Sequence, residues 1–194
     1  MRSSAASDVY KRQLDTVISQ TVSWKQGTNN TVFTADFLKN VSSTASDWTV
    51  VFLGRLGITE DYNAFLNRAN TYVKDQYDAN PFTGLSTNTP TEWHRLTMAV
   101  LAAGGDPTDV GGHDLIADGT YNCLAGAPWN QGMNGAAWAL LALDSKGYEV
   151  PEGAKYTREA LISYILGKEL SGGGWSLDDK NPSLDLDITS MVVY

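Results

Sequence analysis

Three tryptophans stand at equal intervals along the chain, and the segments around them constrain the fold more than any other feature. Trp48, Trp93 and Trp138 are 45 residues apart each time, and each opens a segment that is apolar nearly all round and closes on glycine: WTVVFLGRLG, WHRLTMAVLAAGG and WALLALDSKG. Glycine at that place suits the left-handed residue that ends many helices. We therefore predict three helices that are buried on all sides, and the segment ITSMVVY begins a fourth of the same kind.

The segments between these helices have a different pattern. Residues 60–76 place apolar side chains at spacings of three and four and polar side chains on the other face, and residues 157–170 repeat the arrangement. Such helices need cover on one face only. A chain that alternates the two kinds at a fixed period builds stacked helical hairpins. Since no segment shows sustained strand alternation, the sequence predicts an all-α fold with an inner layer of apolar helices and an outer layer of amphipathic ones.

The composition restricts the class of function. The 194 residues carry 14 basic and 22 acidic side chains, a net charge of −8, and Lys and Arg form no cluster. A phosphate-binding surface therefore has no source, and no nucleic acid is expected as a partner. No apolar run reaches the about 18 residues that a membrane-spanning helix needs. Cys123, the single cysteine, excludes an internal disulfide and leaves the compartment open.

The segment TREALISYILGKELSGGGWSL resembles the QW repeat of squalene and terpene cyclases, with Glu169 in place of the glutamine and Gly173-x-Trp175 at the matching distance. With TEWHRLTMAVLAAGGDP, GMNGAAWALLALDSKGYEVP and LDLDITSM, it makes residues 40–194 similar to the terpenoid cyclase/protein prenyltransferase superfamily. That resemblance implies an α/α toroid of about six hairpins, of which about three to four fit here. Within the superfamily, the chain resembles bacterial exported and cell-surface proteins related to the cobalamin carriers intrinsic factor and transcobalamin.

The two ends of the sequence lead to further predictions. Residues 1–13, MRSSAASDVYKRQ, lack the apolar segment of a secretion signal, and the VYKRQ ending resembles translated adapter sequence that contaminates metagenome assemblies. We expect residues 1–13 to be non-native, residues 14–40 to form part of an N-terminal hairpin, and residues 41–194 to form toroid repeats that are truncated at the C-terminus. A truncated toroid would leave its last inner helix uncovered, so Val192, Val193 and Tyr194 should present apolar surface.

The segment SLDLDITSM bears on catalysis. It resembles the Asp-x-Asp-Asp-Thr-Ala motif of class II cyclases, in which the middle Asp protonates an alkene; by position that acid is Asp187, Asp185 precedes it, and Ile188 replaces the third acid. Such an acid needs neighbours that tune it, so the replacement damages the motif. The alternative is structural, because an Asp directly before an apolar helix caps the first free amides. We favour Asp187 as a helix cap over Asp187 as a catalytic acid.

Other chemistries lack a complete motif. Asp178 and Asp179 are not followed by the third acid that the magnesium–diphosphate site of class I terpene synthases requires. His113, Asp118 and Cys123 lie within one short stretch, but they do not reproduce the zinc-ligand spacing of protein prenyltransferases. We therefore predict no metal and no cofactor.

The residues that open each predicted inner helix are the natural ligand contacts, because in toroids these junctions rim a central depression. The candidates combine tryptophan with amide and charged groups, which suits a flat polar ligand or a sugar. They are Thr91, Glu92, Trp93, His94 and Arg95 in one repeat, and Trp129, Asn130, Gln131 and Asn134 in the next. A structural alternative stays open, in which the tryptophans fill gaps between hairpins and Glu92 pairs with Arg95 along one helix face.

These features predict a non-catalytic toroid module of a bacterial exported or cell-surface protein. It would bind a small molecule or glycan, cobalamin-like or carbohydrate, or act as a scaffold, in a chain that carries additional domains. Its location would be extracellular or at the cell surface. The alternative is a class II terpene or triterpene cyclase, an isomerase that uses Asp187 as its general acid.

Overall fold

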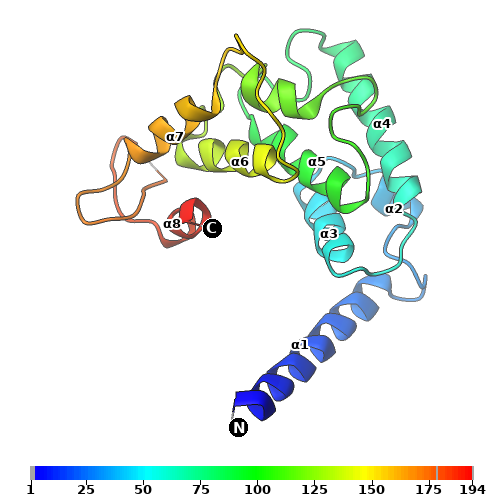
Figure 1. Ribbon diagram of the computed structural model, residues 1–194. Helices are drawn as coiled ribbons and strands as arrows, with labels where there is room; N and C mark the ends of the chain where they lie inside the picture. Colours follow the sequence, from blue (N-terminus) through cyan, green and yellow to red (C-terminus); the bar gives the residue numbers. More distant parts are fainter. Residues whose placement is uncertain (1–2, 178, 194) are drawn as a thin grey trace.

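Helices make up the regular structure of the chain (Figure 1). The computed structural model describes residues 3–177 and 179–193, and these contain no β-strand, only an isolated bridge between Val110 and His113. The helices are α1 (Ser3–Gln26), α2 (Ala35–Leu38), α3 (Thr44–Arg55), α4 (Tyr62–Ala79), α5 (Thr91–Ala102), the π-helical turn η1 (Ala117–Tyr121), α6 (Gly132–Asp144), α7 (Arg158–Leu166) and α8 (Leu186–Val193). The predicted all-α class is confirmed. Among the described helices, none is both long and apolar enough to cross a bilayer.

The helices α3 and α5 lie side by side and run in the same direction. Arg95 pairs with Asp47 near the first turns of the two helices, and Gly54 meets Ala102 near their last turns. A Cβ atom on Gly54 would lie 2.2 Å from the carbonyl oxygen of Ala102, so glycine is what lets the two backbones approach so closely. The pair forms the start of an inner layer.

The helix α6 continues this layer on the other side of α5. Gln131, directly before α6, accepts hydrogen bonds through Oε1 from the backbone N–H (3.1 Å) and the hydroxyl (2.8 Å) of Thr91, the first residue of α5. The layer is curved, because α3 and α6 touch across α5 although they are not neighbours: the ring centroids of Trp48 and Trp138 are 5.2 Å apart. These two rings therefore lie on the concave side of the inner layer.

The helices α4 and α7 cover the convex side of this layer; α4 has the predicted amphipathic pattern, whereas α7 buries one face and leaves Ile162 and Leu166 exposed on the other. Asp61 caps α4 by accepting a hydrogen bond from the N–H of Ala64 (3.0 Å), and α4 buries a stripe at spacings of four: Phe65, Ala69, Val73 and Tyr77. The helix α7 buries Leu161 and Ile165 in a cluster shared with α6. The predicted ends differ, because α4 extends to Ala79 and α7 stops at Leu166, four residues short of position 170.

The predicted alternation fails between α5 and α6. Residues 103–131 contain turns and the five-residue η1 instead of an amphipathic helix. Two glycines in this stretch, Gly111 and Gly112, have φ values of 62° and 84°, which interrupt a helix. A Cβ on Gly119 would lie 2.4 Å from the Cβ of Trp93, so η1 packs directly on α5 at a distance that only glycine permits.

The equal spacing of the tryptophans does not mark equivalent positions. Trp48, Trp93 and Trp138 are the fifth, third and seventh residues of α3, α5 and α6. Trp93 is fully buried on the convex side of α5, whereas the other two meet on the concave side. The prediction of burial on all sides is wrong for α3, since Trp48 and Phe52 are 38% and 39% exposed.

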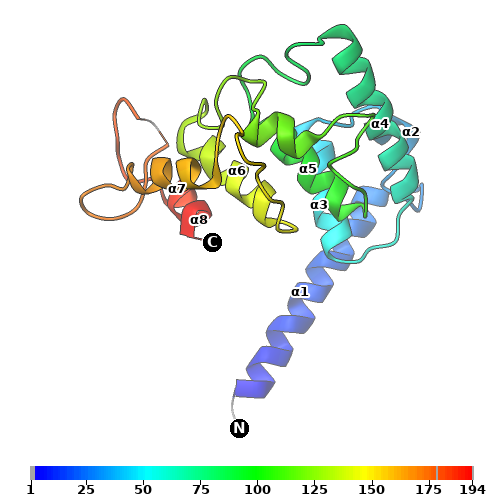
Figure 2. The same cartoon turned by 45° about the horizontal axis from the view of Figure 1, so that its top comes forward.

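The first and last helices lie at the two ends of the layer. The helix α1 extends away from the body, as both views show (Figure 1, Figure 2), and it contacts the body near its end through Ile18 and Val22. It runs without a break across the predicted boundary between residues 13 and 14. The helix α8 buries Ile188 and leaves Val193 69% exposed, whereas Val192 is half-buried against the cluster around α6, so the predicted apolar surface is present at Val193 and only in part at Val192. Tyr194 lies outside the described residues.

Candidate functional site

A network of charged side chains lies where α3 and α5 begin. Arg95 donates from Nε to Asp47 Oδ2 (2.9 Å) and from Nη2 to the carbonyl oxygen of Ser42 (2.7 Å), and its guanidinium also pairs with both carboxylate oxygens of Glu92. Asp47 also contacts Ser42, because its Oδ1 accepts a hydrogen bond from the backbone N–H of Ser42 (3.0 Å). The pairing of Glu92 with Arg95 confirms the structural alternative for these two residues.

The two central side chains of this network, Asp47 and Arg95, are buried or nearly so, and this gives the network a structural role. The side chain of Asp47 is fully buried and that of Arg95 is 11% exposed. Loss of water raises the pKa of Asp47 to about 6, although Arg95 acts in the opposite direction. Ser42 has a φ of 68°, which non-glycine residues rarely adopt, and the network holds both its N–H and its carbonyl. The network therefore fixes the loop before α3, and Glu92 is its most exposed charged group.

Asp47 is the charged member of this network that is not among the predicted site residues. An acidic residue in the first turn of an apolar helix is the available signal, but acidic residues favour that position in any helix because of the helix dipole. Its ion pair with Arg95 spans 48 residues and follows only from the parallel packing of α3 and α5.

Trp93 and His94 lie inside the protein. The indole N–H of Trp93 donates to the Tyr77 hydroxyl (2.8 Å), and His94 Nε2 donates to the carbonyl oxygen of Gly119 (2.9 Å). That hydrogen bond places the imidazole proton on Nε2 and leaves Nδ1 without a partner among the described residues. Burial lowers the pKa of His94 to about 4, so the ring is neutral at pH 7. Neither side chain reaches the surface where a ligand could contact it.

Trp129 belongs to an aromatic cluster on the outer side of α6. Its ring stacks on Tyr164 with centroids 5.0 Å apart and meets Tyr156 edge-on at 5.2 Å. The side-chain amide of Asn130 donates to the carbonyl oxygen of Ala125. Since Gln131 is bound to Thr91, Asn134 is the candidate amide in this repeat for which the structure gives no internal hydrogen bond, and it is half-buried.

The cap of α8 is Asp185 and not Asp187. Asp185 Oδ1 accepts a hydrogen bond from the backbone N–H of Ile188 (2.9 Å), whereas Asp187 is the second residue of α8 and is exposed. The shift by two residues follows from the loop before the helix, where the Asp185 N–H donates to the carbonyl oxygen of Trp175 (2.9 Å) and anchors that loop. The helix-cap interpretation therefore holds for the motif but was assigned to the wrong carboxylate.

The QW-like segment closes this end of the molecule. Trp175 Nε1 donates to the carbonyl oxygen of Ile165 in α7 (2.7 Å), and its backbone N–H donates to the hydroxyl of Thr189 in α8 (2.9 Å). The segment thereby ties α7 to α8. Glu169, at the position of the motif glutamine, is exposed.

The residues considered as metal ligands have other partners. The His113 ring stacks on Tyr77 at 3.7 Å, and Asp118 accepts a hydrogen bond from the Tyr77 hydroxyl (2.7 Å). Cys123 is buried, which raises its pKa to about 11. Among residues 3–177 and 179–193, no group of three or more potential ligands converges on one point. Asp178 lies outside the described residues, and Asp179 pairs with Lys168.

An apolar hollow lies between α6 and α8. It has a volume of about 550 Å³ and borders Ile165 of α7. Its lining is mostly apolar: Ala137, Trp138, Leu140, Leu141, Ile165, Met191 and Val192, with Asp144 and Ser190 as polar members. We call this hollow the α6–α8 pocket. No local sequence pattern indicates this pocket, because it exists where α8 leaves part of α6 uncovered.

A second apolar hollow lies at the other end of the inner layer, between α1 and α3. Its volume is about 300 Å³, and it is lined by residues that include Val22, Trp24, Trp48 and Phe52. Trp48 lines this hollow and Trp138 lines the α6–α8 pocket, so the contact between the two rings lies between the two hollows.

The geometry defines an all-helical protein with an apolar concave face and a polar edge whose side chains are largely paired with one another. No protein-family model, curated protein or solved structure matches this sequence.

Proposed function

We propose that this chain is a non-catalytic binding module, built like a partial α/α toroid, whose ligand occupies the α6–α8 pocket on the concave side of the inner helices. The observation that carries the proposal is the pocket itself. Its volume of about 550 Å³ falls within the range of small-molecule sites, about 300–1,000 Å³, and its lining is predominantly apolar. The resemblance of residues 40–194 to the toroid superfamily also favours a ligand on the concave side, because the central depression of a toroid lies on that side.

The lining indicates the chemistry of the ligand. Trp138 offers a flat ring and the aliphatic side chains offer surface, so affinity comes from burial of apolar area. At the margin, Asp144 pairs with Arg158 (2.6 Å), which leaves a partly exposed ion pair beside the opening. We therefore propose a small molecule with a large apolar face and a polar end. A glycan at the polar edge has less support, because Arg95, Gln131 and Trp129 already have internal partners.

A class II cyclase has less support than a binding module. An acid that protonates an alkene must be shielded from water, and Asp187 is exposed on the first turn of α8. Asp185 is engaged as the helix cap. Formation of a cyclised product from squalene or geranylgeranyl diphosphate, abolished by Asp187→Asn, would reverse this ranking.

The proposal includes a location outside the cell or at its surface, with additional domains in the same chain. Both parts rest on the resemblance to the exported branch of the superfamily. Sequencing of the native gene across both ends tests them. An export signal upstream supports the location, and a cytoplasmic reading frame that continues into further QW-type repeats contradicts it.

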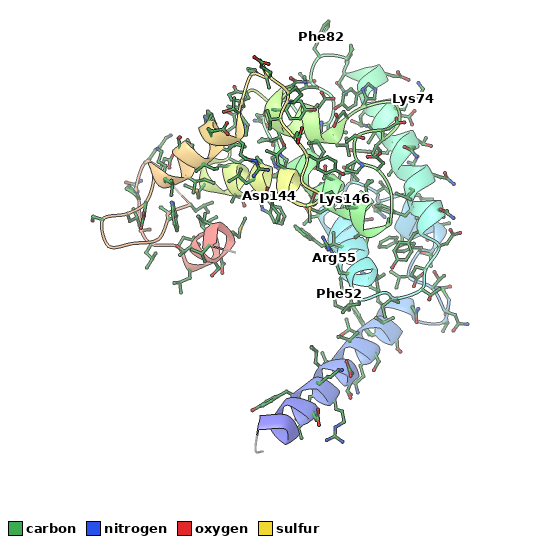
Figure 3. All side chains as sticks on the ribbon, viewed as in Figure 1. Phe52, Arg55, Lys74, Phe82, Asp144 and Lys146 are labelled. Atoms are coloured by element: carbon green, nitrogen blue, oxygen red, sulfur yellow. The ribbon has the colours of Figure 1, made fainter. Side chains whose placement is uncertain are left out.

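Binding is tested by calorimetric titration with cyanocobalamin, cell-wall oligosaccharides and geranylgeraniol as an apolar probe. Ala137 lines the pocket, so Ala137→Trp fills it, and we expect at least a tenfold loss of affinity, about 1.4 kcal/mol, for any probe that binds there. Phe82→Ala is the matched control, because Phe82 lies in the loop after α4, away from the pocket (Figure 3). Absence of heat with every probe, or equal affinity of the wild type and Ala137→Trp, would contradict the proposal.

A further inference from the structure

The charge in the α6–α8 pocket lies at one end of an apolar surface. Among the described residues that line the pocket, Asp144 alone carries a formal charge, and it is the last residue of α6 (Figure 3). Ala137 lines the same pocket seven residues earlier, about 10 Å along the helix axis. The wall between them is apolar, with Trp138 and Leu141. The pocket therefore has a long apolar part and a carboxylate at one margin.

The carboxylate of Asp144 has capacity for a second cation. Arg158 Nη1 lies 2.6 Å from Asp144 Oδ1, and no residue that the structure describes donates a hydrogen bond to Oδ2. Arg158 is not part of the pocket lining. Because a carboxylate accepts hydrogen bonds on both oxygens, a bound cation need not displace Arg158. Arg158 then holds the carboxylate in place at the margin.

Two further features favour a positive charge at this margin. The last turn of α6 contains no basic residue, and the C-terminal end of a helix carries a partial negative charge that a nearby cation stabilises. The hydroxyl of Ser190, which also lines the pocket, donates its proton to the carbonyl oxygen of Leu186 (2.7 Å). Towards a ligand, Ser190 therefore offers only an acceptor, as Asp144 does.

The charge of the whole protein acts in the same direction. The net charge of −8 attracts cations and repels anions as they approach the surface. Residues 1–13 carry three basic and one acidic side chains, so the negative balance belongs to the remainder of the chain.

We propose that the α6–α8 pocket binds an amphipathic cation, a molecule with an apolar body at least about 10 Å long and a protonated amine at one end. The inference rests on the proposed function and names the class of ligand that the pocket takes. The apolar body lies along Trp138 and Leu141, and the ammonium group contacts Asp144 at the end of α6. A carboxylate or phosphate at the same end would meet the carboxylate of Asp144 and the negative end of the helix.

The test compares three probes that share one alkyl chain and differ in the polar end: decylamine, decanol and decanoate. Calorimetric titration at pH 7, below the concentrations at which the probes aggregate, should find decylamine about tenfold tighter than decanol, because a hydrogen bond to a charged group is stronger than a neutral one. Decanoate should bind more weakly than decanol. Asp144→Asn should abolish the preference for the amine and retain the binding of decanol, and that binding shows that the variant is folded.

Asp187→Asn is the matched control, because it removes the same charge from an exposed position outside the pocket lining and should leave the preference for the amine unchanged. Equal affinities of the wild type for the three probes, or a preference that persists in Asp144→Asn, would overturn the assigned ligand class and leave the pocket as a binding site. Absence of binding by all three probes, or equal binding by Ala137→Trp, would overturn the class and the proposed function together.

Discussion

At the scale of single residues, two buried titratable side chains respond to pH in opposite directions. Burial raises the pKa of Asp47 to about 6 and lowers the pKa of His94 to about 4. The contribution of Asp47 to the free energy of unfolding is fully present below the ordinary Asp pKa of about 3.9, and it is lost as pH rises through the pKa of Asp47 in the folded protein. The contribution of His94 to the free energy of unfolding is fully present above the ordinary His pKa of about 6.5, and it is lost as pH falls through the pKa of His94 in the folded protein. Each shift corresponds to about 3 kcal/mol, so the two effects nearly cancel.

Substitution separates the two effects. As pH falls from about 7 to about 4, the wild type should lose about 3 kcal/mol of unfolding free energy through His94, because the unfolded imidazole takes up a proton more readily than the buried one. The variant His94→Gln should not show this loss. Relative to the wild type, Asp47→Asn should show the opposite slope and gain as pH rises over the same range, since no buried carboxylate has to ionise. Urea unfolding at several pH values measures both. Stability curves of the two variants that run parallel to that of the wild type would contradict the assignment.

At the scale of elements, the start of α8 depends on one carboxylate. Asp185→Ala removes the oxygen that accepts the N–H of Ile188 and should lower the free energy of unfolding by about 1 kcal/mol. Asp187→Ala is the matched control, because Asp187 is exposed and its loss should cost less than about 0.5 kcal/mol. Thermal unfolding of both variants measures the difference. Equal destabilisation, or a larger effect at Asp187, would show that the cap lies where the sequence first suggested.

The junction of α3 and α5 depends on the absence of a side chain. Gly54→Ala places a methyl group against the backbone of Ala102 and should cost about 1–3 kcal/mol by overpacking, although alanine favours helices. Gly172→Ala is the control, since a Cβ there meets nothing within 4 Å. Denaturant midpoints of the two variants give the comparison. A Gly54→Ala variant as stable as the wild type would mean that the helices can move apart freely.

The elements also show what the sequence could predict. The stripe of α4 and the apolar length of α6 are local patterns, so helices were expected at the right places. The missing outer helix between α5 and α6 could not be expected from period alone, because it depends on Gly119 and on the packing of η1 against Trp93. The shift of the α8 cap to Asp185 likewise depends on a backbone contact with Trp175, ten residues earlier.

At the scale of the whole molecule, curvature creates the candidate site. The concave face carries Trp48 and Trp138 from helices that are not neighbours, and their contact follows from the angle between helices rather than from any local pattern. The predicted ligand contacts were placed at the helix starts, where Arg95 and Gln131 bind other parts of the protein. The unfilled space lies instead along α6, where α8 gives partial cover. Local sequence patterns therefore predict these helices, but they indicate the polar helix starts and not the apolar side of α6 where the pocket lies.

The measurement that tests this conclusion most directly is methyl NMR of the protein during titration with geranylgeraniol and with cyanocobalamin. Ligand binding in the α6–α8 pocket predicts chemical-shift changes that are largest at the methyl groups of Ala137, Leu140, Leu141, Ile165, Met191 and Val192 and small at those of Val73 and Leu96 on the convex side. Saturable changes confined to the pocket methyls would establish the site. Saturable changes elsewhere with an undisturbed pocket, or no changes with either probe, would contradict it.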